Sequence, residues 1–146
     1  MSAAPSSRAV DLSALVLRVA FGGGMLALHG LPKLQKVLDG DLGFADPLGL
    51  GATTSLYLAV FSELVCGALV VLGVATRAAT IPLAFTMIVA VFIVHGGDPI
   101  GDRELGLAYL AGYVAILALG PGRLAVSSAW ASALEKRPAA VRWLFG

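Results

Sequence analysis

The chain has 146 residues, of which 58% are hydrophobic and only 13% are charged. A water-soluble domain of this length needs more polar surface than that composition supplies. The formal net charge is +1, and no basic run is interleaved with aromatic residues, which excludes nucleic acid as an expected partner. The composition therefore predicts a protein that has the lipid bilayer as its solvent and partner.

Apolar stretches of about 16 to 22 residues follow one another along the chain, close to the length that crosses a bilayer core. The first predicted span runs from Leu12 to Leu31, with Asp11 as its helix cap and Pro32 as its end. Arg8 in front of it imitates a signal peptide, but the length of the run and Arg18 within it predict a retained span.

Three further spans are predicted at residues 53–73, 78–95 and 103–120, the second and third joined by a tight hairpin. The fold class is therefore all-α: a polytopic membrane protein built as an antiparallel bundle of four transmembrane helices. Residues 12–123 form this membrane domain, between an N-terminal segment (1–11) and a tail (124–146). The tail mixes aromatic and basic residues, a pattern typical of a segment at the membrane surface or in the cytoplasm.

The distribution of lysine and arginine predicts the orientation. With an even number of crossings both termini lie on one side, which carries six of these residues: Arg8, Arg77, Arg123, Lys136, Arg137 and Arg142. The other side carries Lys33, Lys36 and Arg103. We therefore expect both termini in the cytoplasm.

Arg18 and Glu63 are charged residues inside predicted spans, where an unpaired charge costs several kcal/mol. Counted from the same membrane side, the two differ in depth by roughly 6 Å, which an arginine side chain can reach. We predict that they pair in the bundle interior, either as a structural clamp or as a ligand or proton site. Small residues four apart, at Ala59 and Gly67 around Glu63, predict close helix approach on this face.

His29 and His95 end the first and third spans, so a bundle places both at the outer side. They could ligate a metal or haem, contact a polar ligand such as a quinone carbonyl, or serve as structural residues of the interface. Their position at helix ends argues against a buried haem, and we predict no metal site. Glu104 opens the fourth span and is expected either to cap it or to turn inward toward the histidines, with Lys33 completing a polar rim.

Several sequence segments resemble the DoxX family of membrane proteins. They are LRVAFGGGML and HGLPKL in and after the first span, FSELVCGALVVLG in the second, the VATRAATIPLAF hairpin, the histidine-glycine end of the third span, and GPGR after the fourth. The resemblance covers roughly Leu15 to Arg123 and leaves out the tail. It implies a four-helix protein of a bacterial inner membrane, with relatives that include a subunit of a thiosulfate:quinone oxidoreductase.

The resemblance implies a non-catalytic membrane subunit or anchor that helps a redox enzyme reach the quinone pool, with quinone as the non-covalent ligand. No flavin, haem or iron–sulfur motif is present, so catalytic residues cannot be named and electrons would come from a partner's cofactor. Two alternatives stay open: a small transporter or lipid-handling protein that uses Arg18 and Glu63, and a purely structural assembly factor. Transport by so small a unit would require a homo-oligomer.

Overall fold

The structure is a computed structural model that describes residues 7–145, and within that range it consists of helices and loops without strands. Three continuous helices are long and apolar enough to cross a membrane: the first long helix (Arg8–Leu38), the second (Ala52–Leu72) and the third (Thr76–Val94). In chain order the helical segments are α1 (Arg8–Leu17), η1 (Arg18–Gly23), η2 (Leu26–Gly30), α2 (Leu31–Leu38), α3 (Ala52–Val60), η3 (Phe61–Cys66), α4 (Gly67–Leu72), α5 (Thr76–Ile88), η4 (Val89–Val94), α6 (Ile100–Leu119), η5 (Val126–Trp130), α7 (Ala131–Leu134) and α8 (Ala139–Phe145).

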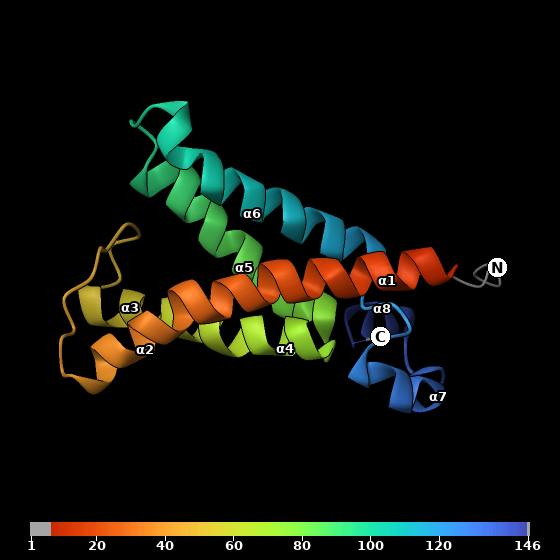
Figure 1. Cartoon of the computed structure of the whole chain (residues 1–146). Helices are drawn as coiled ribbons and strands as arrows, with labels where there is room; N and C mark the ends of the chain where they lie inside the picture. Colours follow the sequence, from red (N-terminus) through yellow and green to blue (C-terminus); the bar gives the residue numbers. More distant parts are fainter. Residues whose placement is uncertain (1–6, 146) are drawn as a thin grey trace.

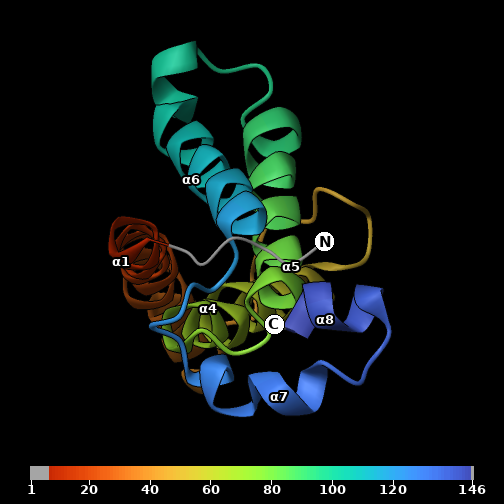
Figure 2. The same ribbon diagram turned by 90° about the vertical axis from the view of Figure 1, so that its right-hand side faces the viewer.

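The long helices are arranged as two antiparallel pairs. The first and second long helices lie side by side, and the third long helix packs against α6 (Figure 1). The two pairs are close at the end that holds α1 and α8 and diverge toward the end that holds α2 and α3 (Figures 1 and 2). The predicted all-helical class is confirmed, as is the tight hairpin, which turns through Gly73 in the left-handed conformation with φ of 73°.

The helix α6 differs from the three long helices in composition. It has 20 residues, but its first turns carry Asp102, Arg103 and Glu104. The length of α6 is sufficient to cross a membrane, but these charges make it less uniformly apolar than the other three helices.

The first long helix corrects two predictions about its ends. Ser7, not Asp11, caps it, because the Ser7 side chain accepts a hydrogen bond from Val10 N at 3.3 Å. Pro32 does not end it either, and the helix continues to Leu38. The π-helical turn η2 directly precedes Pro32, and such a widened turn accommodates the carbonyl that a proline ring would otherwise meet.

Glycines bring the first and second long helices into close contact. A Cβ atom added at Gly22 would lie 3.0 Å from Val70 and 3.2 Å from the Gly67 carbonyl oxygen, and one at Gly30 would lie 2.8 Å from Leu64 N. Ala59, Glu63 and Gly67 are all buried on the facing side. The predicted close approach along this face is therefore confirmed.

We expect Gly30→Ala to lower the free energy of unfolding by about 1 to 3 kcal/mol, because its methyl group would meet the backbone of Glu63 and Leu64. Gly97→Ala is the control, since nothing lies within 4 Å of its added Cβ. Unfolding of detergent-solubilised protein, followed by circular dichroism, measures both. Equal free energies of unfolding for the two variants would contradict a stabilising close contact at Gly30.

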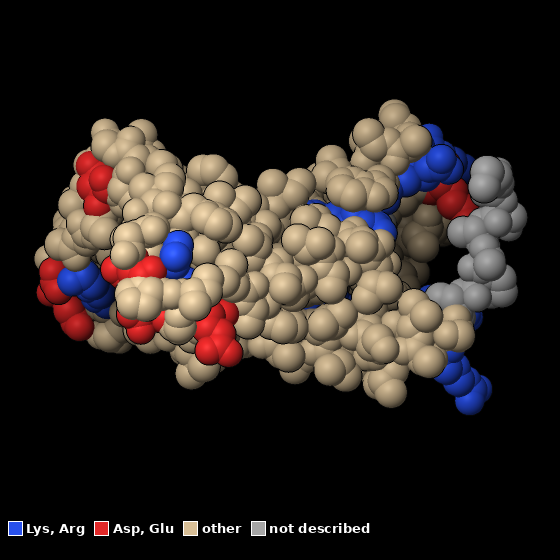
Figure 3. All heavy atoms as spheres, turned by 90° about the horizontal axis from the view of Figure 1, so that it is seen from above, with Lys and Arg blue, Asp and Glu red and all other residues tan. Residues whose placement is uncertain are grey.

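The outer surface of the three long helices and of α6 is apolar. Large side chains on these helices are half exposed or more, among them Leu28 at 70%, Phe92 at 57% and Val114 of α6 at 57%. Charged side chains gather at the two ends of the face seen in Figure 3, and its middle is almost free of them. This distribution is the one that a bilayer core requires.

Candidate functional site

A cavity of about 660 Å³ lies between the two helix pairs, on the side where they diverge. The first long helix, the 39–51 loop, the second and third long helices and α6 all contribute to its wall. Most lining side chains are apolar, and the polar ones are ten: His29, Lys33, Ser55, Ser62, Glu63, Thr86, His95, Asp102, Arg103 and Tyr109. Ligand pockets in proteins have this character and this range of volumes.

Glu63 pairs with Lys33, and the prediction that it pairs with Arg18 was wrong. Lys33 Nζ donates to Glu63 Oε2 at 2.6 Å. The side chain of Glu63 is 5% exposed and that of Lys33 is 21% exposed, so the carboxylate is the more deeply buried partner. The tight contact at Gly30 sets the first long helix against Glu63, which brings Lys33 within reach. The pair places one positive and one negative group at the cavity wall.

Arg18 instead caps the end of the second long helix. Its guanidinium donates to the backbone oxygens of Val70 (3.4 Å), Val71 (2.7 Å) and Leu124. The last carbonyls of a helix have no intrahelical partner and form the negative end of its dipole, so a cation is stabilised there. Arg18 is 1% exposed and does not line the cavity. It therefore ties the first two long helices to the segment after α6.

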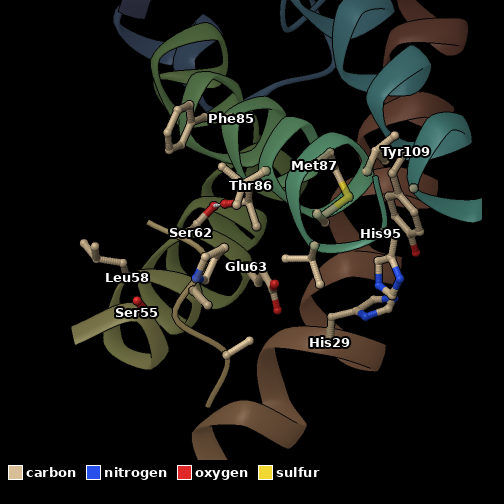
Figure 4. A pocket seen from close by; sticks show the side chains of 18 of the residues that line it. His29, Ser55, Leu58, Ser62, Glu63, Phe85, Thr86, Met87, His95 and Tyr109 are labelled. Atoms are coloured by element: carbon tan, nitrogen blue, oxygen red, sulfur yellow. Dashed lines mark hydrogen bonds between the residues drawn. The ribbon is translucent and has the colours of Figure 1, made fainter. Parts of the chain in front are cut away.

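The histidines and Tyr109 lie at one end of the cavity. His29 and Tyr109 pack edge to face with ring centroids 5.7 Å apart. His95 contributes its ring from the end of the third long helix and lies 2.7 Å from Asp98 Oδ2 through Nδ1. Figure 4 shows His29, His95 and Tyr109 on the same side of the pocket, away from Leu58 and Phe85. The predicted rim of His29, Lys33 and His95 thus does line one site.

Glu104 is the exception among the predicted rim residues. It is exposed and does not line the cavity, so the inward orientation predicted for it was wrong. Its place is taken by Tyr109, which lies on the buried face of α6. The only sequence signal for Tyr109 was a tyrosine inside an apolar helix, whose hydroxyl group needs a polar environment.

A hydrogen bond between two small polar residues joins the second and third long helices beside the cavity. The hydroxyl groups of Ser62 and Thr86 are hydrogen-bonded, with 2.9 Å between Oγ and Oγ1 (Figure 4). Phe61, Ser62 and Glu63 are consecutive and have three roles: Phe61 lines the cavity while half exposed, Ser62 meets Thr86, and Glu63 meets Lys33. Sequence reasoning singled out only Glu63 of these three.

Asp46 organises the 39–51 loop, which covers part of the cavity through Phe44, Pro47 and Leu48. Its carboxylate accepts hydrogen bonds from Leu50 N (2.8 Å), Gly51 N (2.9 Å) and the Ser55 hydroxyl group (2.9 Å). The hydrogen bond from Gly51 N, with those from Ser55 and Leu50, holds the pKa of Asp46 below its ordinary value. Through Ser55, Asp46 also links the loop to the first turns of α3.

We expect Asp46→Ala to loosen the 39–51 loop while the long helices stay folded. Because the folded-state pKa is lowered, the Asp46 contribution is fully present above its ordinary pKa near 4 and is lost as the pH falls through the lowered value. The Leu50 and Gly51 amides should therefore be protected from hydrogen exchange. The free energy of local opening, derived from their exchange rates, should stay constant from about pH 5 to 8. Asp39→Ala, on a residue outside the cavity wall, is the control. Unchanged protection in Asp46→Ala would contradict this role.

Arg77 repeats the capping role of Arg18 at the end of α6. Its Nε donates to the Leu117 carbonyl oxygen at 2.8 Å, and its Nη1 donates to the Trp143 oxygen at 3.2 Å. The guanidinium also lies 5.2 Å from the centroid of the Trp143 ring. The tail is therefore fastened to the third long helix through α8.

The cavity can hold a ligand with an apolar body and a hydrogen-bonding head. Lys33, His29 and Tyr109 can donate hydrogen bonds to carbonyl oxygens, and Glu63 can accept one from a hydroxyl group. The charged pair lies in a low-dielectric setting, where such hydrogen bonds are stronger than in water. Groups of this kind can bind and orient such a ligand and exchange protons with it, and electron transfer would need a cofactor.

Comparison with known proteins identifies the family. The family model DoxX matches residues 13–96, more than half of the chain. No curated protein and no solved structure matches significantly. The matched range includes both members of the Lys33–Glu63 pair and both histidines. The chain belongs to the DoxX family.

Proposed function

We propose that this DoxX family protein is the membrane subunit or anchor of a quinone-linked redox enzyme, and that it holds the quinone head group in the cavity between its helix pairs. The observation that carries the proposal is the Lys33–Glu63 pair on the wall of a largely apolar cavity. A quinone has the complementary chemistry, because its ring is apolar and its two carbonyl oxygens accept hydrogen bonds.

The polar groups support a head-group position near Lys33. The Lys33 ammonium group has three N–H donors and Glu63 occupies one of them, so the others remain for a carbonyl oxygen. His29, packed against Tyr109, lies one helical turn before Lys33 and offers a second donor to the same space. A hydroquinone carries hydroxyl groups in place of these carbonyls, and Glu63 is placed to accept a hydrogen bond from one of them.

The same proposal includes a topology of four crossings in a bacterial inner membrane, with α6 as the fourth span and both termini in the cytoplasm. Support comes from the 20-residue length of α6 and from the excess of basic residues at the α1 and α8 end. Acidic side chains gather mainly at the opposite end in Figure 3. Labelling of single cysteines introduced at Gly43 and Ser132 with a membrane-impermeant reagent tests it. Labelling of residue 43 alone from outside is expected.

The alternative of proton or anion handling by an Arg18–Glu63 pair loses its basis, because each residue has another partner. A structural assembly factor remains as the competing outcome of the binding experiment. In that case substitutions at Glu63 would lower the amount of folded protein, and the wild-type protein would show no quinone binding.

Titration of the purified protein in lipid nanodiscs with a short-tailed benzoquinone tests the proposal. We expect saturable binding that Glu63→Gln weakens about tenfold, equivalent to about 1.4 kcal/mol, because Lys33 then loses the carboxylate that holds it at the cavity wall, while the protein stays folded. Glu104→Gln is the matched control, because Glu104 is exposed and outside the cavity wall. Non-saturable partitioning in wild type, or an equal effect of both substitutions, would overturn the proposal.

A further inference from the structure

We propose that the cavity opens sideways into the bilayer between Phe61 and Phe85, and that the hydrocarbon tail of the bound ligand lies in this opening. The inference rests on the proposed quinone site and adds the route of entry and the position of the tail. We call the opening the lateral portal, and it consists of Leu58, Phe61 and Phe85.

The first observation is that the portal side chains face the cavity and the outside at once. All three line the cavity. Nevertheless Leu58 is 51% exposed, Phe61 52% and Phe85 54%. Each of these side chains is therefore part of the cavity wall and part of the outer apolar surface of the helices at the same time.

The second observation is the depth of this opening. Phe61 lies nine residues after the start of the second long helix and Phe85 nine after the start of the third, which is about 14 Å along each helix. These helices are antiparallel and start at opposite membrane sides, so both residues lie near the middle of a bilayer core of about 30 Å. The hydrogen bond between Ser62 and Thr86 holds the next residue of each helix at the same level. The opening therefore meets acyl chains.

The third observation is that the cavity is polarised. Figure 4 shows Leu58 and Phe85 on one side and His29, His95 and Tyr109 on the other, with Glu63 between them. A ligand with its head at Lys33 and Glu63 can extend an apolar chain past Phe61 into lipid. The occupant of the portal is thus the hydrocarbon tail of the quinone, which never has to leave the apolar phase.

The 39–51 loop favours entry from the bilayer over entry from water. Phe44, Pro47 and Leu48 line the cavity from this loop, and the carboxylate of Asp46 holds the loop to the start of α3. A ligand arriving from the aqueous end would have to displace these contacts.

Photo-crosslinking in nanodiscs locates the two ends of the ligand. One probe is a decyl-tailed benzoquinone with a diazirine at the end of its tail, and a second carries the diazirine on the ring. We expect the tail probe to label Phe61 and Phe85 above the level at Phe92, an equally exposed lipid-facing residue outside the cavity wall. The ring probe should label the peptides of Lys33 and Tyr109. Tail labelling confined to the 39–51 loop would overturn the portal.

A third probe separates this inference from the proposed function. A phosphatidylcholine with a diazirine on one acyl chain carries no quinone. Enrichment of its label at Phe61 and Phe85 over Phe92, together with no specific ring labelling, would keep the portal and reject quinone as its ligand. Ring labelling at Lys33 with equal tail labelling at all three phenylalanines would keep the quinone site and reject the portal.

Matched phenylalanine variants give a kinetic test. Phe85→Ala should raise the dissociation rate of the decyl-tailed quinone about tenfold, because the tail loses a wall of its channel. A tail-less quinone should dissociate from Phe85→Ala at the wild-type rate, which excludes damage to the head-group site. Phe92→Ala should change neither rate. Equal effects of Phe85→Ala on the tailed and tail-less ligands would contradict the portal.

Discussion

Replacement of Arg18 by methionine is expected to lower the free energy of unfolding by about 3 kcal/mol or more. The guanidinium donates to three backbone oxygens, those of Val70, Val71 and Leu124, and it is almost fully buried. Methionine fills a similar volume but donates nothing, so these carbonyls would stay unpaired in an apolar environment. The contact between the second long helix and the segment after α6 would be lost with them.

Arg18→Lys and Arg8→Met distinguish capping from a general effect of charge. Lysine keeps the charge and can serve some of the carbonyls, so Arg18→Lys should recover part of the stability. Arg8 is exposed at the start of α1, and its replacement should change stability by less than about 0.5 kcal/mol. Unfolding in mixed micelles with increasing SDS measures all three. If Arg18→Met were as stable as wild type, Arg18 would have no capping role.

The Lys33–Glu63 pair should show an asymmetric double-mutant cycle. Lys33→Met leaves the buried Glu63 carboxylate without its partner and should cost about 3 kcal/mol. Glu63→Gln leaves Lys33, whose longer and more exposed side chain can reach polar surroundings, and should cost only about 1 kcal/mol. The double variant Lys33→Met/Glu63→Gln should recover most of the loss, because no buried charge remains unpaired.

The same SDS titration measures the cycle, and the coupling free energy is the quantity of interest. Additive losses in the double variant would mean that the two residues do not interact across the helix pair. A larger loss in Glu63→Gln than in Lys33→Met would mean that the lysine, not the carboxylate, depends on the pair for its burial.

Hydropathy predicted most of the fold, because about 20 apolar residues in succession have few stable alternatives to a membrane helix. The second and third spans were predicted to within a few residues, and the small residues at Ala59 and Gly67 predicted the close helix pair. The helix ends were less predictable. Local π-helical geometry carries the first long helix through Pro32, which a one-dimensional pattern cannot indicate.

The partners of buried charges were the main failure of prediction. The expected Arg18–Glu63 pair assumed that an intramembrane arginine needs a carboxylate, whereas the free carbonyls at a helix end satisfy it equally well. Lys33 was placed on the rim, yet it reaches Glu63 because the first long helix continues past Pro32. The prediction for Glu104 failed because the direction of its side chain depends on the rotation of α6, which its sequence pattern does not determine.

Mass spectrometry of the gently solubilised native protein tests the central claim most directly, since it reports bound small molecules and copurified proteins together. We predict a bound quinone and a redox enzyme at fixed stoichiometry in wild type and in Glu104→Gln. In Glu63→Gln the quinone should be lost while the enzyme is retained. A wild-type chain that carries only phospholipid, without quinone or a redox partner, would contradict the account.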